Sequence, residues 1–190
     1  VFKATVGLLE QFGPKRVRDC PISEQAILGA AMGAAMTGLK PIAEIMFSDF
    51  LAVCWDIVAN EIAKTRYMTN GQISLPLVIR TANGAGSRFG AQHSQSVENW
   101  AMAIPGLKIV APSTPEDARG LLLAAVHDPD PVLFFEHIAL YRDPRIRQVL
   151  PDVAPSMPIG RAALRRQGND LAVISYGAYV HVALRVAHRL

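Results

Sequence analysis

Apolar and polar positions along the chain predict short buried strands separated by helices. Continuous apolar runs, typical of strands buried on both faces, lie at residues 42–47, 77–80, 107–111, 132–136 and 171–176. Apolar residues at helical spacing lie at 23–36, 49–68, 113–127 and 180–190. This alternation predicts an α/β fold whose mostly parallel sheet is covered by helices on both faces.

The pattern changes between residues 143 and 159, where prolines separate charged and small residues without periodicity. We interpret this segment as a linker. It divides the chain into a first domain at 1–142 and the start of a second α/β domain at 160–190. The chain begins without methionine and ends inside a helical pattern, so we expect it to be a piece of a longer polypeptide.

The helix predicted at 23–36 is apolar on nearly every face, which favours burial on all sides. Ser23 is expected to cap its N-terminus and Gly38 to end it. Glu24 is the one carboxylate at the start of this otherwise small and apolar segment. It either offsets the helix dipole or serves a site.

The composition is that of a globular protein and excludes several functions. Of the 190 residues, 51% are hydrophobic and 18% are charged, which is enough to build a core. The net charge of +3 is scattered rather than gathered in a basic stripe, so we expect no nucleic-acid partner. The longest apolar run is too short to cross a membrane. The two cysteines form no Cys-x-x-Cys motif, which favours a reducing, cytoplasmic setting.

Polar residues follow two of the predicted strands, at 47–50 and at 81–96. Ligands of parallel α/β sheets bind at the carboxyl ends of the strands. We therefore expect these two segments and Glu24 to include the functional side chains.

The glycine-rich part of the second segment does not match a dinucleotide-binding loop, because Phe89 stands where the third glycine would be. His93 near its end is either a structural residue or a ligand-binding one. The glycines before His93 make this loop flexible, which favours the ligand-binding interpretation. The sequence contains no nucleophile elbow, zinc-protease or Walker motif, and its histidines have no metal-ligand spacing.

Four segments, taken together, resemble the beta subunit of the thiamine-diphosphate-dependent decarboxylase component of 2-oxo acid dehydrogenase complexes. They are RDCPISE at 18–24, GAAMTGLKPIAEIMFSDF at 33–50, AQHSQS at 91–96 and PGLKIVAP at 105–112. Transketolases and deoxyxylulose-phosphate synthase are more distantly similar. The resemblance implies a transketolase-like pyrimidine-binding domain, followed by the beginning of a transketolase C-terminal-like domain.

The resemblance also implies roles for four residues. Glu24 matches the acid that hydrogen-bonds the aminopyrimidine of thiamine diphosphate and favours its reactive tautomer; an acid held out of water shares a proton more readily. Phe50 matches an aromatic residue placed against the same ring, although a role in the core alone is the alternative. Glu44, in the strand leading to Phe50, is counted with the cofactor-binding residues. His93 matches a histidine that holds the substrate carboxylate or assists acyl transfer to lipoyl-lysine.

Metal ions are implied in two places. Leu75, Leu77, Asp128 and Asp130 lie near segments that hold a structural potassium ion in some relatives, although turn chemistry explains the two aspartates equally well. The Gly-Asp-Gly motif and later Asn that hold magnesium and the cofactor diphosphate are missing from this sequence. The resemblance implies that an alpha subunit supplies them.

Three functions remain open. The first is a beta subunit in an alpha2beta2 heterotetramer that acts on pyruvate, a branched-chain 2-oxo acid or acetoin. Its partners would be an alpha subunit and a lipoyl-bearing acyltransferase core, and its location a bacterial cytoplasm or a mitochondrial matrix. Alone, such a chain is expected to be inactive. The second is a fragment of a single-chain transketolase-like or deoxyxylulose-phosphate synthase-like enzyme. The third is a non-catalytic binding or scaffold domain that retains the fold.

Overall fold

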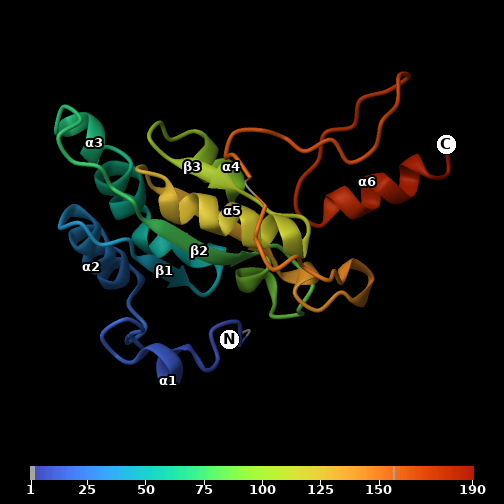
Figure 1. Ribbon diagram of the computed structural model, residues 1–190. Coiled ribbons are helices and arrows are strands. Elements are labelled where there is room, and N and C mark those ends of the chain that lie inside the picture. The colour runs from blue at the N-terminus through green and yellow to red at the C-terminus, as the bar shows by residue number, and fades with distance from the viewer. Residues whose placement is uncertain (1–2, 156) are drawn as a thin grey trace.

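A parallel four-stranded sheet lies at the centre of the computed structural model, which describes residues 3–155 and 157–190 (Figure 1). Its strands, in the order β1-β2-β4-β3, are formed by β1 (Ile42–Ile45), β2 (Val78–Asn83), β4 (Val132–His137) and β3 (Lys108–Val110). All three pairings are parallel. The predicted α/β class is therefore confirmed, and the carboxyl ends of the strands share one edge.

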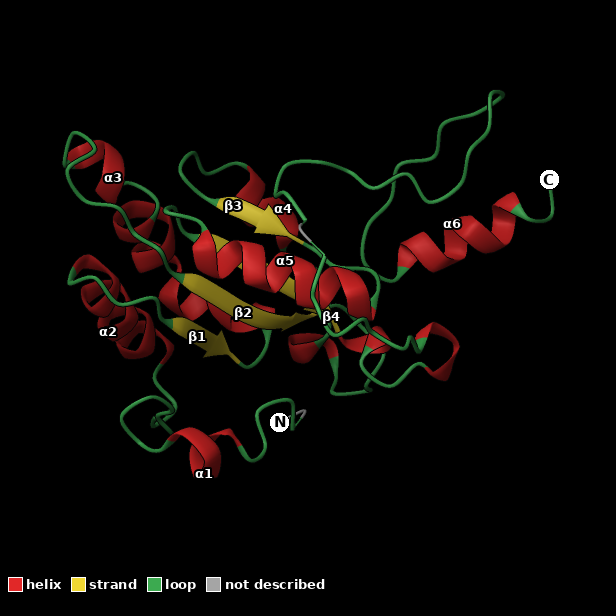
Figure 2. Cartoon of the chain, in the orientation of Figure 1, coloured by secondary structure: helices red, strands yellow, loops and turns green. Residues whose placement is uncertain are grey.

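Helices cover both faces of this sheet (Figure 2). The α-helices of the described residues are α1 (Leu8–Phe12), α2 (Glu24–Met36), α3 (Thr65–Met68), α4 (Glu98–Met102), α5 (Pro115–His127) and α6 (Tyr179–Ala187), of which α6 extends away from the sheet. On one face, α5 packs through Leu121, Leu122, Ala125 and Val126 against Val78, Val110, Val132 and Phe134. On the other face, α2 and residues 48–62 cover Ile45, Ile79, Leu133 and Phe135. Burial on both faces explains why the strands are continuous apolar runs.

The single helix predicted at 49–68 is wrong, because the structure divides this region into three pieces. They are a 3-10 helix at Ser48–Cys54, a π-helical segment at Ile57–Ile62, and α3. The Ala63 amide donates to the Val58 carbonyl five residues earlier, at 3.1 Å, which widens the turn. Of the apolar residues at that spacing, Leu51, Val58 and Ile62 are buried, whereas Val53 is 62% exposed.

Helix α2 begins and ends where the sequence predicts, but the expected burial on all sides is wrong. Only Leu28 and Ala35 are buried, and Met36 is 43% exposed. Apolar composition alone does not decide burial, since one side of the helix is covered by the sheet and residues 48–62. Gly38 ends the helix with a φ of 96°, as predicted, whereas the Ser23 side chain makes no capping bond with the described residues.

The C-terminal region has less regular structure than predicted. Residues 171–176, all described, form no strand and pair with none of β1–β4. A strand needs a neighbour for its backbone hydrogen bonds, so the predicted fifth strand is wrong here. The helix predicted from residue 180 is present as α6.

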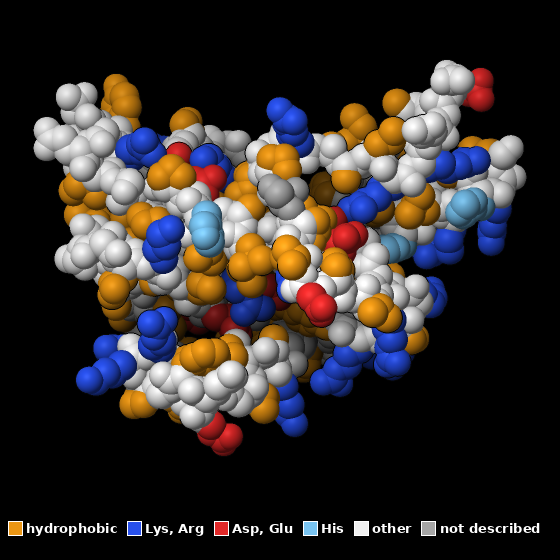
Figure 3. All heavy atoms as spheres, viewed as in Figure 1, with side chains coloured by type: hydrophobic (Ala, Val, Ile, Leu, Met, Phe, Trp, Pro, Cys, Tyr) orange, Lys and Arg blue, Asp and Glu red, His pale blue; other side chains and the backbone are white. Residues whose placement is uncertain are grey.

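The predicted linker at 143–159 lies partly against α5. Arg119 of that helix donates hydrogen bonds to the carbonyls of Pro151 and Asp152. Residue 156 of the linker, like residues 1 and 2 of the first domain, lies outside the described residues, and the domain boundaries stay a prediction. Lys and Arg side chains are spread over several parts of the face in Figure 3. Among the described helices, none has the length and apolar character needed to cross a membrane.

Candidate functional site at the carboxyl edge of the sheet

Four aromatic side chains meet where β1 and β2 end; we call them the aromatic group (Phe47, Phe50, Phe89 and His93). The His93 ring centroid lies 4.8 Å from that of Phe47 and 5.2 Å from that of Phe50, both edge to face. Phe89 packs on Phe47 at 5.6 Å. Such contacts are favourable beyond the area that they bury. The structure therefore brings together Phe50 and His93, two of the predicted site residues.

His93 carries a polar atom that the described part of the chain leaves unsatisfied. Its Nδ1 is buried and has no hydrogen-bond partner there. Leaving a buried nitrogen without a partner costs roughly 1–3 kcal/mol. A bound molecule with a polar group at this position would remove that cost, so the site fits a polar ligand held beside an aromatic ring.

Glu24 is half-buried at the start of α2, the helix whose Leu28 shares a core cluster with Leu51 and Cys54. The charge of Glu24 acts on Cys54, the last residue of the 3-10 helix Ser48–Cys54. Burial raises the pKa of the Cys54 thiol to about 11, and the charge of Glu24 adds to this rise. The Cys54 thiol also donates to the Phe50 carbonyl at 3.5 Å. Glu24 is therefore close enough to Cys54, the last residue of the short helix that carries Phe50, for its charge to act on the thiol.

Glu44 belongs to a different cluster. Its carboxylate lies 3.5 Å from Arg80, whose guanidinium binds Glu136 through two bonds of 2.6 and 2.8 Å. The Tyr141 hydroxyl donates to Glu136 at 2.8 Å. Burial and the neighbouring Glu136 raise the Tyr141 pKa above its usual range, so the phenol keeps its proton. The structure does not place Glu44 in the aromatic group, and its role in binding a cofactor stays a prediction.

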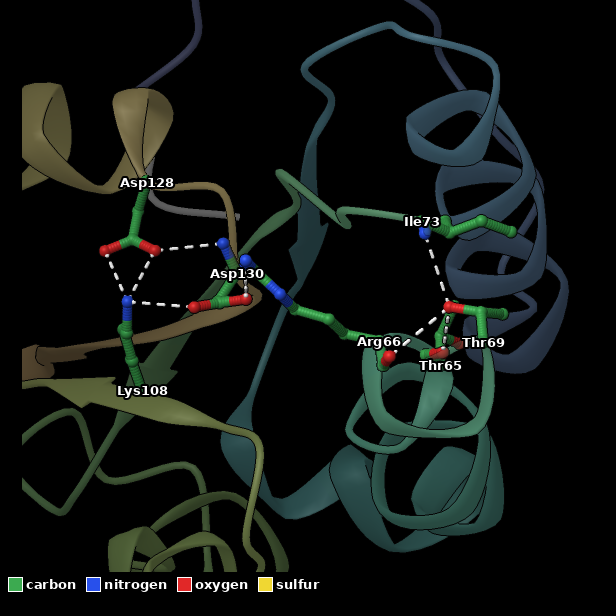
Figure 4. A network of polar contacts seen from close by, with 7 residues as sticks. All are labelled: Thr65, Arg66, Thr69, Ile73, Lys108, Asp128 and Asp130. Carbon is green, nitrogen blue, oxygen red and sulfur yellow. Dashed lines mark hydrogen bonds and ion pairs between the residues drawn. The ribbon is translucent and has the colours of Figure 1, made fainter. Parts of the chain in front are cut away.

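The segment predicted to bind potassium is held together by cationic side chains (Figure 4). The Lys108 ammonium lies 2.7 and 2.9 Å from the two carboxylate oxygens of Asp128, and 3.2 Å from Asp130. Arg66 binds Asp130 at 2.6 Å. These ion pairs lower the pKa of Asp130 and raise that of Lys108, although partial burial opposes both shifts.

The backbone of this segment is engaged as well. The Leu75 carbonyl accepts from the Leu77 amide at 2.8 Å, and the Leu77 carbonyl accepts from Val132 at 2.9 Å. Among residues 3–155 and 157–190, no three His, Cys, Asp or Glu side chains are grouped to hold a metal ion. Ion pairing accounts for the positions of Asp128 and Asp130, and a structural potassium ion held largely through backbone carbonyls stays a prediction.

Two buried polar residues of this edge were not singled out by the sequence reasoning. Asn83, at the end of β2, donates to Glu98 at the start of α4 over 2.6 Å, and both side chains are buried. Their separation of 15 positions has no periodicity that predicts a contact. The one signal is that Asn83 is a polar residue at the end of a largely buried strand.

A cavity of about 640 Å³ lies next to the aromatic group and was also not expected. Its lining includes Ser87 and Phe89 from the loop after β2, and Tyr141 and Arg142 from the segment after β4. It therefore opens at the same edge of the sheet as the aromatic group.

These features define the class of α/β proteins that bind a ligand at the carboxyl edge of a parallel sheet. Within this class the family is shown by comparison. Residues 1–144 match the family described as "Transketolase, pyrimidine binding domain", and the chain belongs to that family.

Curated relatives confirm the resemblance to beta subunits of 2-oxo acid dehydrogenases. The whole chain is 52% identical to the 2-oxoisovalerate dehydrogenase subunit beta of Bacillus subtilis (strain 168), covering 58% of it. It is 48% identical to the acetoin:2,6-dichlorophenolindophenol oxidoreductase subunit beta of the same organism, covering 55%. It is 45% identical to the mitochondrial pyruvate dehydrogenase E1 component subunit beta-1 of Arabidopsis thaliana, covering 52%. The chain thus spans a little over half the length of these relatives.

A solved structure supports the fold. The chain resembles a split-gene transketolase described as an inactive beta4 tetramer, with a TM-score of 0.74 and 22% identity. The match covers 98% of this chain and 57% of the other. At this identity the likeness concerns the fold alone.

Proposed function

We propose that this chain is part of a 2-oxo acid dehydrogenase beta subunit and contributes the aminopyrimidine half of a thiamine diphosphate site. The proposal is supported by the family match and by relatives with this activity in their names. The observation that carries it is the buried, unsatisfied Nδ1 of His93, whose ring is in edge contact with Phe50. A flat, polar heterocycle fits these surroundings.

Thiamine diphosphate, when bound, supplies the nucleophilic carbon and the electron sink for decarboxylation of a 2-oxo acid. Glu24 would share a proton with a nitrogen of the aminopyrimidine ring, in an interaction that partial burial strengthens. Phe50 would pack against that ring and exclude water. His93 would bind the substrate carboxylate through an N–H, or assist transfer of the acyl group to lipoyl-lysine.

The remaining ligands of the cofactor are proposed to come from another chain. This sequence has no Gly-Asp-Gly motif for magnesium and the diphosphate; its nearest string is Gly168-Asn-Asp170, beyond the first domain. We infer an alpha subunit that supplies them in an alpha2beta2 heterotetramer, which acts with a lipoyl-bearing acyltransferase core. The setting would be a bacterial cytoplasm or a mitochondrial matrix.

Among substrates, a branched-chain 2-oxo acid or acetoin is favoured over pyruvate. The identities of 52% and 48% to proteins of the first two kinds exceed the 45% to the pyruvate enzyme. The match to the transketolase pyrimidine-binding family keeps a transketolase-like enzyme as the second candidate. A Gly-Asp-Gly motif upstream on the same polypeptide would favour that candidate.

The test is reconstitution of the full-length chain with its alpha subunit, thiamine diphosphate and magnesium, followed by 2-oxo acid-dependent dye reduction. Glu24→Gln is expected to lower the rate by at least about 100-fold, within the range for a lost acid–base group. Glu10→Gln is the matched control, since Glu10 is an exposed acid in the first turn of α1. Equal activity of wild type and Glu24→Gln would refute the role of Glu24 and leave it an ordinary helix-terminal acid.

A further inference from the structure

The loop that carries His93 is closed at its base by hydrogen bonds to Asp49, the residue before Phe50. It leaves β2 at Gly84, whose amide donates to the Gln95 carbonyl at 2.8 Å. Oδ1 of Asp49 accepts two hydrogen bonds from Gln95, at 3.2 Å from the backbone amide and 2.8 Å from the side-chain amide. Asp49 is only 8% exposed. Charge-assisted bonds of this kind are stronger than neutral ones.

A second set of buried hydrogen bonds holds the other end of this loop, where the chain leaves β2 after Asn83. Oδ1 of Asn83 accepts from the Ser48 hydroxyl at 2.8 Å and from the Val97 amide at 3.3 Å. Its amide group donates to Glu98 at 2.6 Å. Ser48 and Asn83 are at most 1% exposed. The two residues before Phe50 therefore hold both ends of the segment that contains His93.

The loop needs these anchors because its own backbone is permissive. Gly86 and Gly90 have φ values of 136° and 79°, and Arg88 between them has a φ of 59°. Such glycines favour several loop conformations rather than one. Asp49 adjoins Phe50 in sequence, and Gln95 lies two residues after His93. Besides the ring contacts, the Asp49–Gln95 pair thus links the two sides of the aromatic group.

We propose that Asp49 is a positioning residue that, through Gln95, holds the His93 ring against Phe50. It acts on catalysis only by fixing where His93 lies. The inference rests on the proposed function, because it assumes that the placement of His93 matters for acyl transfer.

The experiment uses the assembled alpha2beta2 complex with the full-length chain. Two rates are measured, 2-oxo acid-dependent dye reduction and acylation of a lipoyl domain. Asp49→Ala is expected to slow lipoyl acylation at least about tenfold, since small misplacements of a reacting group are costly. Asp49→Asn keeps the Oδ1 acceptor and is expected to stay within about threefold of wild type.

If Asp49→Ala fails to fold, Gln95→Ala still tests the proposal, because Gln95 is exposed and its replacement leaves the core unchanged. It removes one of the two bonds and is expected to slow acylation by a smaller factor than Asp49→Ala. Gln92→Ala, an exposed glutamine of the same loop, is the matched control and should leave both rates unchanged.

A second readout reports the loop without catalysis. Trypsin cleaves after Arg88, which is exposed near the tip of the loop. Cleavage there should become several-fold faster in Asp49→Ala and stay at the wild-type rate in Asp49→Asn. Wild-type rates of cleavage and acylation in both Asp49→Ala and Gln95→Ala would overturn the proposal.

A double variant separates the two proposals. Adding Asp49→Ala to His93→Ala should slow acylation no further, because the two changes remove one function. A further loss as large as that of Asp49→Ala alone would overturn the positioning role. If His93→Ala alone acylates at the wild-type rate, the function proposed for His93 is wrong, and the rate of cleavage after Arg88 still decides whether Asp49 anchors the loop.

Discussion

Replacing Glu136 by glutamine is expected to destabilise the fold far more than the same change at Glu44, although both carboxylates lie beside Arg80. The Glu136 side chain is 12% exposed and that of Arg80 15%, whereas the Glu44 side chain is 42% exposed. Glu136 binds the guanidinium through two short bonds, and Glu44 lies 3.5 Å away. Removing one partner of a buried ion pair costs about 3–5 kcal/mol.

Glutamine keeps one acceptor for Arg80, so we take the lower end of that range, about 3 kcal/mol, for Glu136→Gln. An exposed pair contributes about 0.2–1 kcal/mol, which sets the expectation for Glu44→Gln. With a urea m-value of about 2 kcal/mol/M, the midpoint of Glu136→Gln should fall by about 1.5 M.

Urea unfolding followed by circular dichroism measures both variants, with an unchanged m-value as the check on two-state behaviour. Equal destabilisation by the two changes, or a loss below about 1 kcal/mol for Glu136→Gln, would refute the reasoning from burial. Cofactor affinity of Glu44→Gln in the assembled complex separately tests the cofactor-binding role predicted for Glu44.

Three further predictions follow from the charges and buried groups. The Cys54 pKa is raised to about 11, so a thiol reagent at neutral pH should label Cys54 only after unfolding. The exposed Cys20 should be labelled rapidly, and rapid labelling of both cysteines would contradict this prediction. The contribution of the Cys54 thiol to stability is present below about pH 9, the ordinary value, and is lost as the pH rises towards 11. Burial lowers the His137 pKa below 6.5. As the pH falls below 6.5, the unfolded chain therefore binds a proton first, and the stability of the folded chain drops. In thermal melts at pH 7.5 and 5.5, His137→Gln should weaken this drop, and an identical drop in the variant would contradict the prediction. Since Lys108 already binds Asp128 and Asp130, exchanging potassium for sodium should shift Tm by less than about 2 °C. A larger stabilisation by potassium would contradict this and support the potassium site.

The positions of the central strands could be predicted from the sequence because each is an apolar run short enough to exclude a helix. The same signal failed at 171–176, since an apolar run becomes a strand only beside a neighbour that accepts its hydrogen bonds. The helical spacing at 49–68 identified Leu51, Val58 and Ile62 as buried, but it predicted neither the exposure of Val53 nor the break. The hydroxyls of Thr65 and Thr69 donate to carbonyls four residues earlier, at 2.7 and 2.8 Å, and such bonds often bend helices.

The candidate site could be predicted only in outline. Strand ends located the segments of Phe50 and His93, because parallel strands end at one edge. The role of Glu24 came from resemblance, since an acid at a helix start is common. The contacts of Asp49 with Gln95, and of Asn83 with Glu98, join residues that share no periodicity. They become visible only in three dimensions.

The central claim is that Glu24 serves the pyrimidine of a bound coenzyme in a cleft that a second subunit completes. A crystal structure of the assembled alpha2beta2 complex with thiamine diphosphate and magnesium tests it most directly. The measurement is the distance between the Glu24 carboxylate and the nearest aminopyrimidine nitrogen. We predict about 2.6–3.0 Å, a charge-assisted hydrogen bond, with Phe50 packed on the ring. A Glu24 carboxylate that faces bulk solvent, far from the coenzyme, would contradict the account.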